Sequence, residues 1–506
     1  MSQRRTLCQL LICTLFCAHL TFRSVSADDQ PQWGQRHSRN MVSGETGLPE
    51  IFDPATGKNI KWVAPLGSET YATPVVAGGR VLIGTNNNNP RDARHRGDRC
   101  VLLCLDEKDG SLCWQLIVPK LGTDPYLDWP RAGIVSAPTV EGKRVYIVSN
   151  RNEVMCLDLN GQANGNDGPY QNEARHATPE GAEPAALTDK DADIIWLYDI
   201  GAEIVPPHDE AHSSILIDGQ FLYVNTSSGK DSSHRRVRVP EAPSLIVLDK
   251  TTGRLIAKDD EQIGPKIFHC TWSSPALGQV NGRRLIFFCG GDGVVYAFEA
   301  INSAPPMGVV ENLKRVWRFD CDPTAPKENV HDYIGNRQES PSNIKSMPVF
   351  YKDRLYVTGG GDIWWGKNQA WLKCIDAAKT GDVTDAAEIW SYPLEPHCCS
   401  TVSIYNGLVF VADCGHKIHC VDAETGKPYW THDAEGEMWA STLVADGKVY
   451  VGTRRRDVWM LAADKDKRVL GSVKLDSAVV GSPVAANGVL YIATMKNLYA
   501  VEASEK

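Results

Sequence analysis

The stretch SAPTVEGKRVYIV, residues 136–148, contains the phrase that organises this chain of 506 residues. A small residue and a proline lead through a glycine turn into a short apolar strand with alternating side chains. Short alternating runs between Gly, Asp and Asn turns are typical of β-hairpins. The chain contains eight copies of this phrase, some strict and some looser. One is the stretch at Ser136, and the others begin at Thr73, Ser213, Ser273, Ser346, Ser400, Ala440 and Ser482.

A second phrase follows the first, and DAETGKPYW, residues 422–430, is its clearest copy. An acidic turn with glycine precedes a strand that a tryptophan often opens, so each unit is predicted to have four short antiparallel strands. Such a unit cannot bury its faces alone, and copies without spacers between them predict a radial stack, the β-propeller. The last repeat lacks its tryptophan strand, whereas Trp62 stands near the N-terminus without a repeat. We therefore expect the strand of Trp62 to close an all-β, eight-bladed ring.

These repeats resemble those of the pyrroloquinoline-quinone (PQQ)-like propellers, which include the quinoprotein alcohol dehydrogenases and BamB. The acidic-turn, glycine and tryptophan phrases carry the resemblance, and Pro31-Gln-Trp-Gly34 is similar to the start of many secreted members. The resemblance implies a bacterial secreted protein with eight blades. The dehydrogenases of this group hold PQQ and calcium in the axial mouth, beside a disulfide between neighbouring cysteines. A dehydrogenase-like member is therefore expected to bind the same cofactors.

The first 27 residues have the features of a signal peptide. Arg4 and Arg5 precede an apolar stretch over 7–20, and Val25-Ser-Ala27 has the small residues of a cleavage site. A buried helix or a membrane anchor is the alternative. We expect export to the periplasm or beyond, and residues 28–506 to form one propeller domain, a monomer without a further membrane span. The mild net charge of −9 gives no reason to expect nucleic acid as a partner.

Register predicts where a ligand would bind. The inner strand of every blade starts near the axis, so residues just before each Ser/Thr–Pro phrase are expected to meet at one channel mouth. Two columns there are rich in His, Cys and Glu, which suit a metal or a polar small molecule. A wet axial opening without a ligand explains the same composition. The candidate residues are Glu69, Tyr71, His212, Cys270, Lys345, His397, Cys398, Cys399, Glu437 and Trp439, with His208, Asp209 and His269 slightly further back.

Twelve cysteines follow the predicted signal peptide. Cys104, Cys156, Cys374 and Cys420 share a repeat column with alanines, so we predict small buried fillers there. Cys398 and Cys399 are adjacent, and export makes a disulfide between them a tentative prediction. Free thiols, or bonds to other cysteines, are the alternative.

Two functions from different classes remain. No set of residues for the quinone and calcium can be placed position by position, and no nucleophile elbow, phosphate loop or zinc-protease motif occurs. The favoured hypothesis is a non-catalytic module that binds a protein or polysaccharide partner. The alternative is a dehydrogenase with PQQ and calcium in the axial funnel, and a metal site among the His, Cys and Glu residues is a third option.

Overall fold

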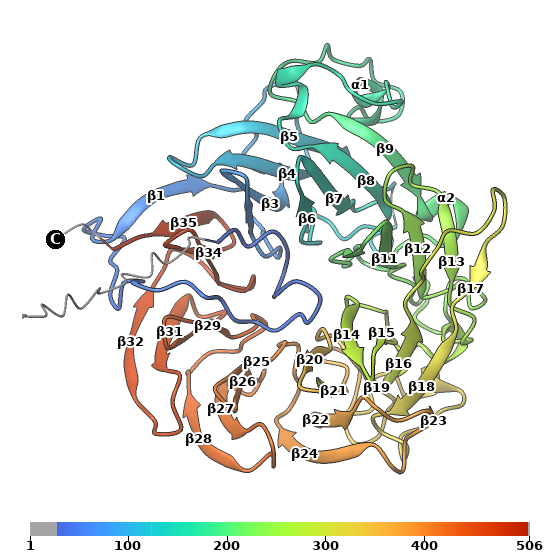
Figure 1. Ribbon diagram of the computed structural model, residues 1–506. Helices are drawn as coiled ribbons and strands as arrows, with labels where there is room; N and C mark the ends of the chain where they lie inside the picture. Colours follow the sequence, from blue (N-terminus) through green and yellow to red (C-terminus); the bar gives the residue numbers. More distant parts are fainter. Residues whose placement is uncertain (1–27, 123, 504–506) are drawn as a thin grey trace, which may run out of the picture.

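The computed structural model describes residues 28–122 and 124–503, and the predicted signal peptide lies outside them. These residues form eight small antiparallel sheets arranged around a central axis, as the repeat count predicts (Figure 1). The first four blades consist of β2 (Val75–Ala77), β3 (Arg80–Asn86), β4 (Arg99–Asp106) and β5 (Leu112–Pro119); β6 (Thr139–Glu141), β7 (Arg144–Val148), β8 (Glu153–Asp158) and β9 (Ile194–Asp199); β10 (Leu216–Asp218), β11 (Phe221–Asn225), β12 (Leu245–Asp249) and β13 (Leu255–Lys258); and β14 (Ala276–Val280), β15 (Arg283–Cys289), β16 (Val294–Glu299) and β18 (Arg315–Asp320).

The remaining blades follow the same order from the inner to the outer strand. They consist of β20 (Val349–Tyr351) with β19 (Ser342–Asn343), β21 (Arg354–Gly361), β22 (Ala370–Asp376) and β24 (Glu388–Leu394); β25 (Ser403–Tyr405), β26 (Leu408–Ala412), β27 (Lys417–Asp422) and β28 (Pro428–Asp433); β29 (Leu443–Ala445), β30 (Lys448–Gly452), β31 (Asp457–Ala462) and β32 (Val469–Lys474); and β33 (Val484–Ala486), β34 (Val489–Ala493), β35 (Asn497–Val501) and β1 (Ile60–Pro65).

A few elements lie outside this plan. Two-residue strands β17 (Glu311–Asn312) and β23 (Gly381–Asp382) pair in parallel with the outer strands β13 and β18. Short helices occupy the loops: η1 (Gly161–Asn164), α1 (Glu173–His176), α2 (Ile200–Glu203), η2 (Gly264–Lys266) and η3 (Val330–Tyr333). None of the helices in the described ranges has the length and apolar character to cross a membrane.

The N-terminal strand closes the ring, as predicted. Strand β1 pairs antiparallel with β35, with Trp62 opposite Ala500. The last blade is therefore built from both ends of the described chain.

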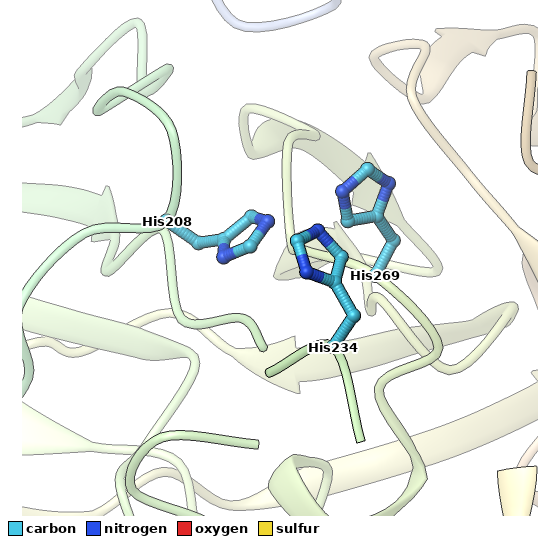
Figure 2. Close-up of side chains that lie close together, drawn as sticks. All are labelled: His208, His234 and His269. Atoms are coloured by element: carbon cyan, nitrogen blue, oxygen red, sulfur yellow. The ribbon is translucent and has the colours of Figure 1, made fainter. Parts of the chain in front are cut away.

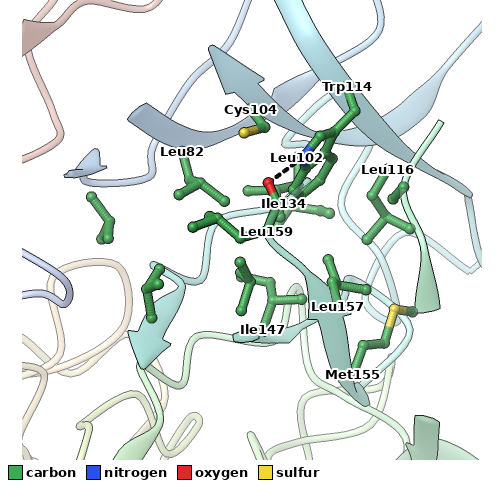
Figure 3. Packing of buried hydrophobic residues seen from close by; sticks show 14 of the residues in the cluster. Leu82, Leu102, Cys104, Trp114, Leu116, Ile134, Ile147, Met155, Leu157 and Leu159 are labelled. Carbon is green, nitrogen blue, oxygen red and sulfur yellow. Dashed lines mark hydrogen bonds between the residues drawn. The ribbon is translucent and has the colours of Figure 1, made fainter. Parts of the chain in front are cut away.

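The repeated tryptophan and glycine form the joint between neighbouring blades. Trp114 on the outer strand of the first blade is fully buried and its Nε1–H donates a 2.8 Å hydrogen bond to the Leu159 carbonyl of the second (Figure 3). A Cβ on Gly161 would lie 2.7 Å from the Trp114 ring, so this turn needs glycine. Cys104, Cys156, Cys374 and Cys420 are buried free thiols in these joints, which confirms them as small fillers.

A segment before β1 crosses the axis of the ring, and we call residues 29–45 the strap (Figure 1). It contacts every blade on or beside its inner strand, through Gln30–Val76, Pro31–Val140, Arg39–Ser214, His37–Leu277, Ser38–Phe350, Asn40–Ile404, Met41–Val444 and Ser43–Ala485. Inner strands otherwise expose unpaired N–H groups, and the strap's acceptors satisfy several of them. The strap therefore blocks the channel and ties the blades together.

Arg39 fixes the strap at its centre. Its guanidinium is buried and donates to the carbonyls of Trp33, Ser214 and Pro275 over 2.8–3.0 Å, and burial lowers its pKa to about 9. We expect Arg39→Met to lower the free energy of unfolding by about 2 kcal/mol, because buried acceptors lose charged donors while the cost of burying the charge is also removed. Chemical denaturation measures this, and Arg36→Met, at an exposed strap residue, is the matched control. Equal midpoints for the two variants would contradict the role of Arg39.

Candidate functional site

A cavity of about 460 Å³ lies at the axial mouth of the propeller. We call it the funnel. The loops that lead into the inner strands line it, because these loops converge on the axis. The column one or two positions before the Ser/Thr–Pro phrase has eight residues, and all of them lie in the funnel wall: Tyr71, Val135, His212, Trp272, Lys345, Cys399, Trp439 and Val480.

The candidates two positions earlier mostly lie behind this wall. Tyr71 donates its hydroxyl to Glu69 over 3.2 Å, and Trp439 donates its Nε1–H to Glu437 over 2.9 Å. These two carboxylates therefore hold rings of the funnel from outside. Glu210 is the member of this column that lines the cavity itself.

Three other candidates lie away from the funnel wall. Cys270 is buried against the carbonyl groups of Ser227 and His208, and His397 donates its Nδ1–H to the Gly361 carbonyl over 3.0 Å. Cys398 lies in the apolar core of the fifth and sixth blades.

The predicted disulfide between Cys398 and Cys399 is not formed in the structure, where both thiols are free. Their side chains have different surroundings, since Cys398 belongs to the core and Cys399 lines the funnel. Cys399 instead lies beside the thiol of Cys414, which lowers the pKa of Cys399.

Aromatic side chains from irregular loops complete the wall. Trp33 comes from the strap, Tyr126 and Trp129 from the loop after β5, and Trp364 and Trp365 from the loop after β21. Trp364 and Trp365 are neighbours in the sequence and stand outside the repeat register. The loop after β5 has no counterpart in the other repeats, so no pattern predicts its position.

Asp362 connects the tryptophan loop to the charged groups of the funnel. Its Oδ1 accepts the amide N–H groups of Trp364 and Trp365 at 3.0 Å. Its Oδ2 accepts from Lys345 at 2.8 Å and from His269 Nδ1 at 3.0 Å. Burial would raise the pKa of Asp362, but Lys345 and His269 outweigh burial and hold it well below its ordinary value.

Three histidines meet beside the funnel, each from a different loop (Figure 2). His208 precedes β10, His234 lies between β11 and β12, and His269 precedes β14. Each offers a ring nitrogen, and these atoms lie within 4.8 Å of one another. His208 and His269 are buried, whereas His234 is half-buried. His234 stands in a polar loop outside the repeat register, so no pattern in the sequence points to it.

A close backbone approach brings these loops together. Gly229 forms an isolated antiparallel bridge with Cys270, and the Lys230 amide donates to the His269 carbonyl over 2.9 Å. A Cβ on Gly229 would lie 2.7 Å from the Cβ of His208 and 2.8 Å from the His269 oxygen. Glycine at this position therefore allows His208 and His269 to face each other.

Burial sets the charges of this cluster. It lowers the pKa of His269 to about 4 and that of His208 well below its ordinary value, so both imidazoles are neutral at neutral pH. Burial also raises the pKa of Asp209 to about 7 and lowers that of Lys230 to about 8. The cluster is therefore poorer in charge than its composition suggests.

The fold and funnel define an eight-bladed propeller with a ligand-sized axial cavity. The family model described as "Outer membrane protein assembly factor BamB" matches residues 368–470. A europium-containing methanol dehydrogenase shares the fold with a TM-score of 0.55 at 12% identity, over 92% of this chain and 89% of that one. A quinohemoprotein alcohol dehydrogenase from Pseudomonas putida HK5 gives 0.56 at 13%, over 94% and 81%. No curated protein matches the sequence. The resemblance to PQQ-like propellers is thus confirmed, and the structural likeness concerns the fold.

The funnel residues do not fit a quinone with calcium as the resemblance implies. The rings of Trp272 and Trp364 are tilted by 45°, and those of Trp364 and Trp439 by 82°, so these pairs form no parallel slot for a flat cofactor. Calcium needs six to eight oxygen ligands. Two of the carboxylates at the funnel are already paired, Glu210 with Lys120 at 3.2 Å and Asp362 with Lys345, and Asp209 alone supplies too few oxygen atoms for calcium.

Proposed function

We propose that the protein is an exported binding module whose funnel holds a sugar residue of a polysaccharide. The observation that carries this proposal is the exposure of two funnel tryptophans. Trp129 is 44% and Trp364 43% exposed, and both line the funnel. Large exposed aromatic rings grouped in one cavity mark a binding surface.

The polar groups of the funnel support a sugar rather than an apolar ligand. Asp209, Glu210 and Lys345 line the same cavity as the tryptophans. A sugar ring presents apolar C–H faces to an aromatic ring and hydroxyl groups at its edge, so it uses both kinds of wall. Sites that orient a small ligand typically place a small number of polar groups within a mostly apolar, aromatic cavity.

The shape of the cavity favours a chain end or a single residue over a protein surface. A volume of about 460 Å³ suits a small ligand, whereas protein partners dock on wide and flatter surfaces. The cations of the funnel already cover several ring faces, with Lys345 4.6 Å from the Trp272 centroid and Arg454 4.1 Å from that of Trp439. These faces are therefore less suited to a cationic ligand.

Titration of intrinsic tryptophan fluorescence tests the proposal. Residues 28–506 are titrated with oligomers of glucose, xylose, galactose and N-acetylglucosamine. We expect one of these classes of oligosaccharide to bind with a saturable change in fluorescence. Trp364→Ala should weaken its binding about tenfold, because one aromatic stacking contact is lost. Tyr429→Ala, at a 44% exposed ring of β28 outside the funnel, is the control and should leave binding unchanged.

Two results would overturn the proposal. Saturable binding of PQQ with calcium, without any oligosaccharide binding, would favour the dehydrogenase alternative. Equal weakening by Trp364→Ala and Tyr429→Ala would place the sugar outside the funnel. The match to the BamB family model makes a protein partner the competing hypothesis. If the partner is a protein, neither the oligosaccharides nor PQQ with calcium should bind saturably.

A further inference from the structure

The hydrogen bonds of two buried histidines leave their Nε2 atoms free to act as ligands. His208 donates its Nδ1–H to the Lys230 carbonyl over 2.6 Å, and His269 donates its Nδ1–H to Asp362 over 3.0 Å. In a neutral imidazole with a proton on Nδ1, Nε2 carries a lone pair. Metal-binding histidines are held in this way by a carboxylate or a backbone carbonyl.

No cationic side chain among the described residues donates a hydrogen bond into the space between these lone pairs. The buried ammonium of Lys230 acts on His208, Asp209 and His269 only through its charge. His208 Nε2 and Asp209 Oδ1 are buried atoms without a hydrogen-bond partner in the described part of the chain, and they face each other at 3.6 Å. His269 Nε2 lies 3.9 Å from Asp209 Oδ2. Unpaired buried polar atoms are rare and costly. Either a proton on Asp209 or a bound cation resolves this arrangement.

We propose that His208, His234 and His269 bind one divalent first-row transition-metal ion at the wall of the funnel, with Asp209 beside it. Neutral imidazoles suit Zn²⁺ and its neighbours and not calcium, which prefers oxygen. The ring nitrogens lie within 4.8 Å of one another and converge on one point, so small side-chain rotations bring them to ligand distance (Figure 2). This inference is independent of the proposed sugar, since metal binding is measured without any oligosaccharide.

Two other clusters of possible ligands are already neutralised. The ammonium of Lys120 lies 2.5 Å from Asp128 and 3.2 Å from Glu210, beside Cys100. Arg94 bridges Asp92 and Asp191 beside His95. In the histidine cluster, by contrast, no lysine or arginine of the described ranges forms an ion pair with Asp209, whose ion-pair partners are His208 and His269.

The position of the site gives the metal access to the funnel. His234, His269 and Asp209 line the cavity, whereas His208 closes the site from behind. Three histidines leave a fourth position on the cavity side, which is typical of zinc sites that act on a ligand rather than stabilise a fold. A ligand in the funnel would therefore reach the metal directly.

The experiment uses untagged protein, residues 28–506, freed of metal with EDTA and titrated with Co²⁺ and then Zn²⁺. We expect one Co²⁺ per chain with visible d–d absorption, displaced by one equivalent of Zn²⁺. Coordination by nitrogen predicts no thiolate-to-cobalt charge-transfer band in the near ultraviolet. Such a band would place the metal at cysteines and overturn the proposal.

Two histidines in left-handed turns offer a matched pair of variants. His234 has a φ of 60° and the exposed His416 a φ of 73°. Asparagine tolerates this conformation. We expect His234→Asn to weaken Zn²⁺ binding roughly 100-fold and His416→Asn to leave it unchanged. Equal affinities in these two variants, or one full equivalent of metal in a His208→Gln, His269→Gln double variant that melts normally, would disprove the site.

Discussion

Asp362→Ala is expected to lower the free energy of unfolding by about 3–5 kcal/mol and to abolish the order of the funnel. The fully buried carboxylate has four hydrogen-bond donors around it, from Trp364, Trp365, Lys345 and His269. Its removal leaves the ammonium of Lys345 and two amides without their acceptor in a nearly dry site. An unpaired buried charge is the costliest of these losses.

Thermal and chemical denaturation followed by near-ultraviolet circular dichroism measures this effect, because Trp364 and Trp365, whose amides Asp362 holds, contribute to the signal. Asp362→Asn is the informative intermediate. Its amide oxygen still accepts the two backbone N–H groups but no longer carries the charge that Lys345 needs, so we expect a smaller loss. A control at Asp376, a half-buried turn residue of β22, should change stability by less than about 0.5 kcal/mol. Equal losses at Asp362 and Asp376 would contradict the role of Asp362.

The funnel combines two kinds of structure, and the sequence predicts only one of them. Residues in repeat register, such as Tyr71 and Trp439, could be placed at the axis because every blade enters its inner strand in the same way. Their position follows from the propeller plan alone. The same reasoning predicts that β1 completes the last blade, since a missing strand at one end matches a spare strand at the other.

The other funnel residues lie in segments that do not follow the repeat pattern of the blades. Trp129 and His234 lie in loops that occur once, so nothing in their neighbours indicates where these loops fold. The approach of Gly229 to His208 is a contact between segments about twenty residues apart, and a lone glycine carries no signal for it. The strap was expected only as a family-like start, and its path across the axis depends on partners in every blade.

The disulfide prediction failed for a related reason. Adjacency of Cys398 and Cys399 says nothing about the direction of each side chain. The chain turns from the core of the blade into the funnel at this point, so one thiol is packed among apolar side chains while the other faces the cavity. Closing a ring between neighbouring cysteines requires an unusual local geometry.

Closure of the ring predicts a second large effect, at Trp62. This residue joins the last blade to the first: its Nε1–H donates to the Glu107 carbonyl over 3.0 Å, and its ring covers Gly110, where a Cβ would lie 2.7 Å away. It is 8% exposed and belongs to the core between these blades. We expect Trp62→Ala to lower the free energy of unfolding by about 3–5 kcal/mol, the usual cost of deleting a large buried ring.

Chemical denaturation followed by circular dichroism tests this expectation against two variants. Val63→Ala, at the next residue of β1 and 43% exposed, should stay within about 0.5 kcal/mol of the wild type. Trp430→Ala removes the equivalent joint between the sixth and seventh blades, where Nε1 donates to the Asp464 carbonyl over 2.9 Å. The two ends of the ring meet around β1, through its pairing with β35 and through the Trp62 joint, whereas Trp430 joins two blades that follow each other in sequence. We therefore expect Trp62→Ala, and not Trp430→Ala, to make unfolding less cooperative, because opening there frees a terminal blade. If both variants unfold cooperatively, the joint at Trp62 is as strong as the other joints between blades, and this expectation is wrong.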